Sequence, residues 1–196
     1  MSSYLVIEGV DGAGKSTVAA AVAERLRANG REVVLVREPG GTPLGEEIRQ
    51  ILLHGEHMSP WTEALLFAAQ RAQLAATIVA PALAAGADVV SDRSYYSSLA
   101  YQGGGRDLGV AQVRAVNEAG LGGVVPDVVA VLWLDPDAAL ARQAESDRIG
   151  GEGASFQRRV AETYRRLSED DPSRVHLIDA DRSLEEIVSE IVGFAP

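Results

Sequence analysis

GVDGAGKS, residues 9–16, is the segment from which the architecture of the chain can be worked out. It fits the pattern G-x-x-x-x-G-K-[ST], in which a glycine-rich loop surrounds phosphate oxygens. The run before it, 4–7, is short, apolar and β-prone, and the run after it, 17–29, is rich in Ala, Glu, Arg and Leu. These flanks predict a buried strand and a helix, the context that the pattern requires. A chance glycine-rich turn is the alternative, and the flanks disfavour it.

Each part of this phosphate-binding loop, or P-loop, has a chemical use. Glycines let backbone N–H groups turn toward phosphate oxygens, and the N-terminus of the following helix adds positive potential. Lys15 can reach the β- and γ-phosphates of a nucleotide, and the Ser16 hydroxyl can bind Mg²⁺. The predicted nucleotide-binding residues are Gly9, Val10, Asp11, Gly12, Ala13, Gly14, Lys15, Ser16 and Thr17.

Length and composition restrict the class of protein. The 196 residues favour one domain, 1–196, and the absence of cysteine excludes disulfides and favours a reducing compartment, the cytoplasm. The net charge of −10 disfavours a nucleic-acid partner, which usually needs a basic face, and favours a small phosphorylated ligand. Pro81 and Gly86 interrupt the apolar region 79–87, so no membrane span is expected.

Further apolar, β-rich runs alternate with helical patterns along the chain. Four more buried strands are expected at 32–36, 87–91, 127–134 and 174–178. Helices are expected at 43–53, 61–83, 110–120, 138–145, 156–167 and from 183 onward. This alternation predicts an α/β three-layer sandwich of the P-loop NTPase type, in which a five-stranded parallel sheet carries helices on both faces.

Charged residues follow the second and third strands at their carboxyl ends, where ligands bind in open α/β sheets. Arg37 and Glu38 precede the tight Pro-Gly-Gly loop, and an ordinary turn with solvated charges is an equal alternative. Asp92 stands where such folds usually hold a metal, and Arg93 beside it can form two parallel hydrogen bonds with a phosphate. The sequence therefore points to a phosphate site at this edge of the sheet.

Two other segments suggest a substrate pocket. The segment 94–102 is dense in hydroxyl and amide groups, although a polar surface helix would have the same composition, and Gly103–Gly105 is expected to be a flexible break. In the helix at 61–83, Arg71 follows Phe67 by one turn, so the two side chains can hold a planar polar ring. Taken alone, the pair favours the alternative of a core phenylalanine beside a surface arginine.

Phosphoryl transfer needs positive charge around the transferred oxygens, and the variable positions of the P-loop, 10–13, carry no basic residue. The charge is therefore expected from elsewhere. The polar, glycine-rich segment at about 142–153 is typical of a mobile lid, and its candidates are Arg142 and Arg148. Two surface arginines on a helix are the alternative.

Four motifs, in this order and at this spacing, resemble the thymidylate kinase family. They are EGVDGAGKS at 8–16, REPGGT at 37–42, LFAAQRA at 66–72 and DRSYYSSLAYQG at 92–103. The four together are highly specific, and the resemblance covers essentially the whole chain. It implies ATP- and Mg²⁺-dependent phosphorylation of dTMP to dTDP by a homodimer that pairs through its long helices.

The resemblance also implies the residues of the site. The expected metal ligands are Ser16, Asp11 and Asp92. The residues expected to bind dTMP are Arg37, Phe67, Arg71, Arg93, Ser98, Tyr101 and Gln102. The residues expected to take part in catalysis are Lys15, Asp11, Arg93, Arg148 and Arg142.

Within this set the resemblance gives individual roles. Arg37 and Arg93 bind the dTMP phosphate, Phe67 stacks on thymine, and Arg71 donates to a thymine carbonyl. Ser98 lies beside the base. Tyr101 and Gln102 line the deoxyribose and the ring, and Asp11 helps to position the metal and the acceptor.

Two alternatives belong to other classes. Another nucleoside-monophosphate kinase would share the P-loop, but the Phe67–Arg71 pair and the segment 101–102 favour thymine and deoxyribose. A P-loop switch protein would need ordered segments that contact the γ-phosphate, and the sequence offers no good candidate for them.

Overall fold

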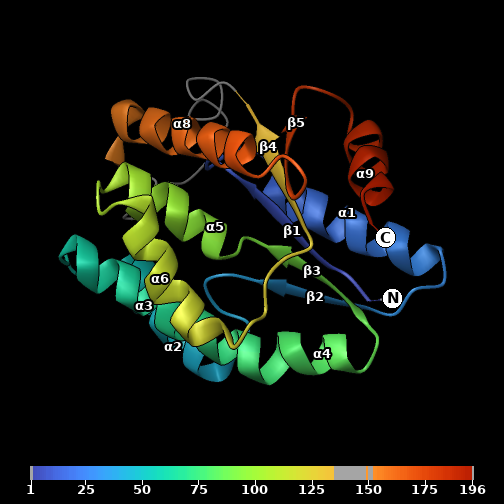
Figure 1. Cartoon of the computed structure of the whole chain (residues 1–196), viewed down its shortest axis with the longest axis horizontal. Coiled ribbons are helices and arrows are strands. Elements are labelled where there is room, and N and C mark those ends of the chain that lie inside the picture. Colours follow the sequence, from blue (N-terminus) through green and yellow to red (C-terminus); the bar gives the residue numbers. More distant parts are fainter. Residues whose placement is uncertain (1, 135–148, 150–151, 196) are drawn as a thin grey trace.

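A five-stranded parallel sheet forms the centre of the computed structural model, which describes residues 2–134, 149 and 152–195 (Figure 1). The strand order is β2-β3-β1-β4-β5. The strands are β1 (Tyr4–Gly9), β2 (Val33–Arg37), β3 (Asp88–Asp92), β4 (Val128–Trp133) and β5 (Val175–Asp179). All five strands predicted from apolar runs are present, each within about two residues of its expected position.

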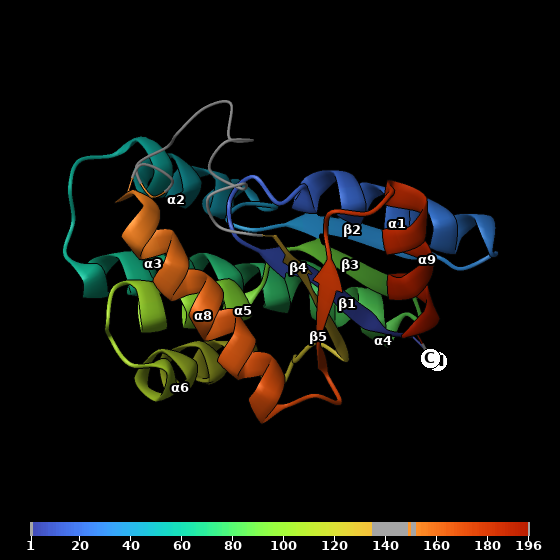
Figure 2. The same cartoon turned by 90° about the horizontal axis from the view of Figure 1, so that it is seen from above.

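Helices cover both faces of the sheet, which confirms the three-layer prediction. The helices are α1 (Lys15–Ala28), α2 (Pro43–His54), α3 (Pro60–Leu74), α4 (Ala80–Ala84), α5 (Tyr95–Ser98), α6 (Val110–Leu121), α8 (Ala154–Asp170) and α9 (Leu184–Gly193). Figure 2 shows α1 and α9 on one face of the sheet and α4, α5, α6 and α8 on the other. The helix expected at 138–145 lies outside the described residues.

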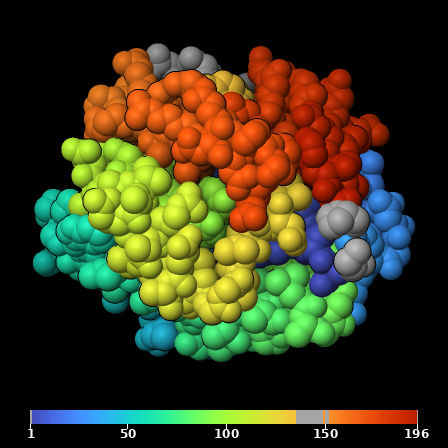
Figure 3. All heavy atoms as spheres, viewed as in Figure 1, coloured from blue at the N-terminus to red at the C-terminus, as the bar shows by residue number. Residues whose placement is uncertain are grey.

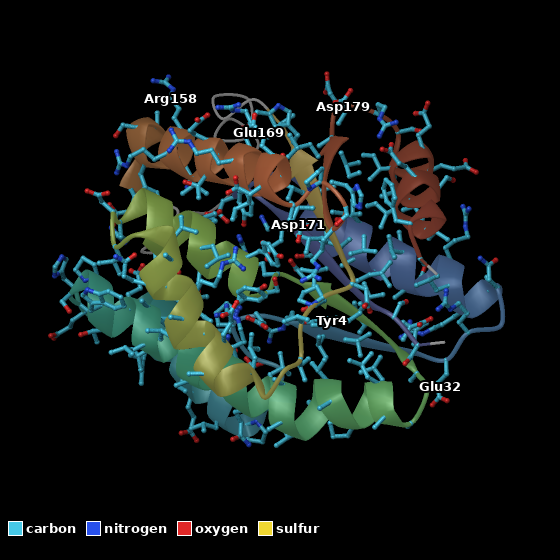
Figure 4. All side chains as sticks on the ribbon, in the orientation of Figure 1. Tyr4, Glu32, Arg158, Glu169, Asp171 and Asp179 are labelled. Atoms are coloured by element: carbon cyan, nitrogen blue, oxygen red, sulfur yellow. The ribbon has the colours of Figure 1, made fainter. Side chains whose placement is uncertain are left out.

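The central strand, β1, leads into the P-loop. Every residue of β1 is buried, as expected for a parallel strand with helices above and below it. At its end, Gly9 has φ 138°, and a Cβ at this position would lie 2.7 Å from the Leu132 carbonyl oxygen of β4. A glycine is therefore required where the chain leaves the sheet. Figure 4 shows Tyr4 at the start of the same strand, in the interior of the molecule.

The segment predicted as one long helix at 61–83 runs continuously from Pro60 to Ala84, with a π-helical turn, η1 (Ala75–Val79), between α3 and α4. Contrary to expectation, this segment is long and apolar enough to cross a membrane, with a mean hydropathy of 1.2. However, α3 packs against α2 and α6, and its Gln70 and Arg71 side chains are buried in polar contacts with Glu38. The α3 part of the segment is therefore packed as a helix of a globular protein.

The prediction that Gly103–Gly105 forms a flexible break is wrong. These glycines end a second π-helical segment, η2 (Leu99–Gly105), which packs against α8. A Cβ on Gly104 would lie 1.9 Å from Thr163 Oγ1, and one on Gly105 would lie 2.6 Å from a ring carbon of Phe156. The glycines permit the close approach of two helical segments. Figure 3 shows the orange atoms of α8 against the yellow-green atoms of η2 and α6 on the face of the molecule that is in view.

This close packing predicts the effect of a small substitution. Gly104→Ala is expected to lower the free energy of unfolding by about 1–3 kcal/mol, because the added methyl group forces η2 and α8 apart. Gly193→Ala is the matched control, since no atom lies within 4 Å of its added Cβ. Urea denaturation of both variants measures the difference. Equal stability of the two would contradict the packing role.

Candidate active site

A cleft of about 380 Å³ opens at the carboxyl ends of β1, β2 and β3. Two backbone hydrogen bonds hold these ends together: Arg93 N–H donates to Ile7 O and Glu38 N–H to Asp92 O, both at 2.9 Å. Most of the predicted site lines this cleft. Its lining includes the predicted residues Asp11, Gly12, Gly14, Lys15, Ser16, Thr17, Arg37, Phe67, Asp92, Arg93, Ser98, Tyr101 and Gln102.

Four of the predicted residues that the structure describes are not part of this lining. Gly9, Val10 and Ala13 support the P-loop from the side of the sheet, and Val10 and Ala13 pack into the hydrophobic core. Arg71 lies behind the wall of the cleft. Arg142 and Arg148 lie outside the described residues.

The P-loop brings a buried ammonium group to the cleft. Gly12 and Gly14 have φ of 83° and 87°, a region that other residues rarely adopt, and Gly14 directly precedes α1. The Lys15 Nζ donates to Val10 O at 2.7 Å, so the side chain folds back over the loop. Burial, followed by the charge of Arg93, lowers the pKa of Lys15 to about 8. The ammonium is present at neutral pH and is poorly solvated, which strengthens its interaction with phosphate.

The pKa of Lys15 gives a prediction about pH. We expect kcat/KM for ATP to fall as pH rises through about 8, by about tenfold per pH unit, because the free enzyme then loses the cation that attracts the phosphates. The profile of kcat is expected to turn down at a higher pH, because bound phosphates stabilise the ammonium. Initial rates measured from pH 6 to 10 test this. A profile of kcat/KM that stays flat to pH 10 would contradict it.

An ion pair connects the P-loop to the end of β3. The Arg93 guanidinium binds the Asp11 carboxylate through Nη2, and its Nη1 donates to Ser97 Oγ at 3.2 Å. It also lies 5.2 Å from the centre of the Tyr101 ring. Burial acts to raise the pKa of Asp11, but Arg93 and Lys15 outweigh it and hold the pKa below its usual value. Asp11 is therefore a carboxylate between two cations.

A pair of oxygen atoms beside the P-loop fits a divalent cation. The Ser16 Oγ lies 2.5 Å from Asp92 Oδ2, and Asp92 Oδ1 is buried without a hydrogen-bond partner among the described residues. Hard oxygen atoms of this kind are the ligands of Mg²⁺, which commonly takes one or two protein ligands and completes its shell with phosphates and water. In the described part of the chain no three acidic or histidine side chains cluster, so an all-protein cage is absent there.

The wall opposite the P-loop is cationic. Arg37 Nη2 donates to both carboxylate oxygens of Glu46, at 2.9 and 3.0 Å, and half of the Arg37 side chain stays exposed. Arg49 of α2 also lines the cleft and donates to Pro39 O at 2.8 Å. We did not predict Arg49. Arg49 lies three residues after Glu46, on the same face of the expected helix, and this spacing is the feature of the sequence that could have indicated it.

A buried network supports the part of the cleft beside Phe67. The Arg71 guanidinium donates to Glu38 Oε2 at 2.5 Å, to Asn117 Oδ1 at 2.5 Å, to Ser98 Oγ at 3.2 Å and to Ser94 O at 3.0 Å. Burial raises the pKa of Glu38, and Arg71 opposes this shift. Arg71 therefore orients Glu38 and Ser98, which line the cleft, and its bond to thymine stays a prediction.

A second support holds Gln102. The Gln102 Nε2 donates to Glu63 Oε1 at 2.8 Å, and Glu63 is almost completely buried in α3. Arg106 binds the same carboxylate at 3.1 Å and reaches Glu152 with its other nitrogen at 2.5 Å. Of these three residues, the sequence analysis predicted only Gln102. Glu63 lies about 40 residues before Gln102 and Arg106 in the chain, so no local pattern connects it with them.

Comparison with known proteins identifies the family of the chain. The family model of thymidylate kinase matches residues 7–191. The chain belongs to the thymidylate kinase family. It is a nucleotide kinase, and its reaction is the ATP-dependent phosphorylation of dTMP to dTDP.

Individual relatives match over nearly their whole length. The chain is 43% identical to the thymidylate kinase of Synechococcus sp. (strain JA-3-3Ab), over 96% of this chain and 92% of the relative. It is 46% identical to the thymidylate kinase of Pelotomaculum thermopropionicum, over 92% of this chain and 86% of the relative. The crystal structure of thymidylate kinase from Ehrlichia chaffeensis superposes with a TM-score of 0.80 at 28% identity and covers 98% of this chain and 97% of that one. The fold is thus shared as well as the sequence.

Proposed function

We propose that the cleft at the ends of β1, β2 and β3 holds both substrates of this thymidylate kinase and that the Asp11–Arg93 pair marks their junction. This pair is the observation that carries the proposal, because it connects the donor side, at the P-loop, to the acceptor side, at the end of β3. ATP binds with its phosphates against the loop amides and Lys15. dTMP binds on the opposite wall, with its phosphate between Arg93 and Arg37.

The metal site in this proposal is formed by Ser16 and Asp92. The unpaired oxygen of Asp92 and the adjacent hydroxyl fit Mg²⁺, which when bound supplies positive charge beside the β- and γ-phosphates. Asp11, the third predicted ligand, contacts two cations, so its supported role is to orient Arg93 and Lys15. Arg142 and Arg148 of the predicted lid remain the candidates for further charge on the transferred phosphoryl group.

The thymine side of the proposal rests on the network behind the cleft. Phe67 offers a ring for stacking, and Ser98 and Gln102 offer polar groups held at fixed positions by Arg71 and Glu63. Donors and acceptors that are held in fixed orientations bind bases with a different hydrogen-bonding pattern more weakly, because such a base leaves buried polar groups unpaired. Tyr101 lies beside Arg93, where the deoxyribose would follow the phosphate.

The assembly and location are also proposed. Large apolar side chains on α2 and α3 are half exposed: Leu44, Ile51, Trp61 and Leu65. Their exposure supports a homodimer that pairs through these helices, and sedimentation velocity would test it. The absence of cysteine supports a cytoplasmic protein.

A panel of acceptors tests the proposed substrate site. Phosphorylation of dTMP, dUMP, dCMP, dGMP and AMP is measured with ATP and Mg²⁺, and dTMP is expected to have the highest kcat/KM. A purine monophosphate as the best acceptor would favour another nucleoside-monophosphate kinase. ATP hydrolysis at the same rate with and without dTMP would favour a P-loop switch protein.

The buried network gives a prediction for Arg71→Lys. Lysine keeps a positive charge beside Glu38 but loses the planar fork that also reaches Ser98 and Asn117. We expect KM for dTMP to rise at least about tenfold while KM for ATP changes less than about twofold. Steady-state kinetics with each substrate varied in turn measure both. Arg166→Lys on the exposed surface of α8 is the control, and equal changes in the two KM values would contradict the assignment.

A further inference from the structure

Glu8, the residue before the P-loop, has a completely buried carboxylate. Five hydrogen bonds from the described part of the chain reach it. Oε1 accepts from Ser94 N at 2.8 Å, Ser94 Oγ at 2.9 Å and Ser97 N at 3.0 Å, and Oε2 accepts from Ser97 Oγ at 2.6 Å and Tyr164 Oη at 2.7 Å. All five donors are backbone N–H groups or hydroxyls. A buried carboxylate is tolerated only when its oxygen atoms are satisfied in this way.

Four of the five donors to Glu8 belong to Ser94 and Ser97, which follow Arg93 closely in the chain. Arg93 has φ 74°, a left-handed conformation that a residue with a side chain rarely adopts and that neighbouring contacts must hold. The bonds of Ser94 and Ser97 to Glu8 fix the backbone that follows this turn. Ser97 Oγ also accepts from Arg93 Nη1 at 3.2 Å, so one hydroxyl group separates the guanidinium from the Glu8 carboxylate.

Tyr164 adds a third element to this cluster. It is buried in α8, and its hydroxyl lies 2.7 Å from Glu8 Oε2 and 3.3 Å from Ser97 Oγ. Burial and the nearby charge of Glu8 both raise the pKa of Tyr164, so the phenol stays a hydrogen-bond donor. Strand β1, the segment after Arg93 and helix α8 thus meet at one carboxylate.

We infer that Glu8 is a positioning residue for phosphoryl transfer: its carboxylate holds the left-handed turn at Arg93 and, through Ser97, aims the guanidinium across the cleft at the P-loop. The inference rests on the proposed role of Arg93 toward the dTMP phosphate. Glu8 itself does not line the cleft, whereas Ser97 and Arg93 do. Its contribution is therefore geometric, and displacement of Arg93 by about 1 Å is enough to lower the rate substantially.

The chemistry of the cluster explains why glutamate is needed. In Glu8→Gln the amide oxygen would stay with the two backbone N–H groups, so the NH₂ group would face Ser97 Oγ and Tyr164 Oη. Ser97 would then receive donors from both the amide and Arg93, and its own proton would lose the carboxylate as its acceptor. The substitution keeps the shape of the side chain and reverses the hydrogen bond between residue 8 and Ser97, the acceptor of Arg93 Nη1.

The test compares Glu8→Gln and Tyr164→Phe with Tyr96→Phe, a buried tyrosine of α5 for which no contact with Glu8 is described. We expect Glu8→Gln to lower kcat/KM for dTMP by about 10- to 100-fold and Tyr164→Phe by about fivefold, with KM for ATP unchanged. Tyr96→Phe is expected to match the wild type. If Glu8→Gln does not fold, Tyr164→Phe carries the same comparison.

The double variant Glu8→Gln/Arg93→Lys distinguishes a failure of the inference about Glu8 from a failure of the proposed function of Arg93. Because Glu8 acts through Arg93, the two substitutions together are expected to be little worse than Arg93→Lys alone. Additive effects, or a lower melting temperature with normal kinetics toward dTMP, would overturn the inference and leave Glu8 a structural residue. If Arg93→Lys alone left turnover of dTMP unchanged, the proposed function of Arg93 would fail instead.

Discussion

Lys15→Met is expected to lower turnover by at least about 100-fold and to leave the free energy of unfolding within about 1 kcal/mol of the wild type. The loss of activity follows from the loss of the buried ammonium that lines the cleft and that we propose to contact the transferred phosphates. The stability is retained because methionine has a similar unbranched shape and removes a poorly solvated charge. The free energy gained by removing this buried charge offsets the hydrogen bond from Lys15 Nζ that Val10 O loses.

Single-turnover kinetics and thermal denaturation measure the two effects separately. Arg166→Met is a suitable control, because this side chain is mostly exposed on α8 and lies away from the cleft. Turnover within about tenfold of the wild type would show that Lys15 does not contact the transferred phosphates. A collapse of the melting temperature would show that the lysine is needed for the fold.

Arg93→Lys is expected to lower kcat by about 100-fold and to weaken dTMP binding, while ATP binding changes little. Lysine keeps the charge but cannot hold Asp11 and Ser97 at the same time as it packs on Tyr101. The backbone is not expected to change, since both residues carry a Cβ in the same left-handed conformation. The expected loss is therefore one of geometry and hydrogen bonding.

Kinetics and calorimetric titration with dTMP and with ATP test this second expectation. Arg114→Lys provides a matched control, because Arg114 likewise lies over tyrosine rings, 5.8 Å from Tyr95 and 5.9 Å from Tyr96, and does not line the cleft. An Arg93→Lys enzyme that binds dTMP normally would remove the acceptor phosphate from the proposed contacts of Arg93.

The two predictions share one feature of the site, the closeness of its charges. Arg93 and Lys15 both approach Asp11, and each cation lowers the pKa of that carboxylate. With either cation replaced, Asp11 keeps one partner, so neither variant leaves an isolated buried charge. For this reason we expect large effects on activity and small effects on stability in both.

Local patterns in the sequence were sufficient for the P-loop, the strands and most of the helices. A glycine loop, an apolar run or a capping residue acts on neighbours a few residues away, so the sequence can be read directly. The capping box at Ser183 and Glu186 is an example, with both of its hydrogen bonds present in the structure. The motifs that resemble thymidylate kinases belong to the same class, because each is a short contiguous stretch.

The partners of the buried side chains depend on which distant segments of the chain come into contact. Local sequence patterns carry no information about such contacts. Arg71 was predicted as a contact of the base, and the fold surrounds it with acceptors from three other segments of the chain. Glu63 was not predicted as a residue of the site, and in the structure its carboxylate accepts a hydrogen bond from Gln102. The glycines at 103–105 were expected to loosen the chain, whereas the arrival of α8 makes them a packing surface.

The residues alone thus determined the phosphate loop, the order of strands and helices and, through the motifs, the reaction. The three-dimensional packing decided how the site is held: Glu8 behind Arg93, Glu38 and Asn117 around Arg71, and Glu63 behind Gln102. The physical reason is that buried charges require partners, and the distance along the chain does not restrict where those partners come from. The motifs indicate the side chains that we propose to face the substrates, and the fold supplies the groups that orient them.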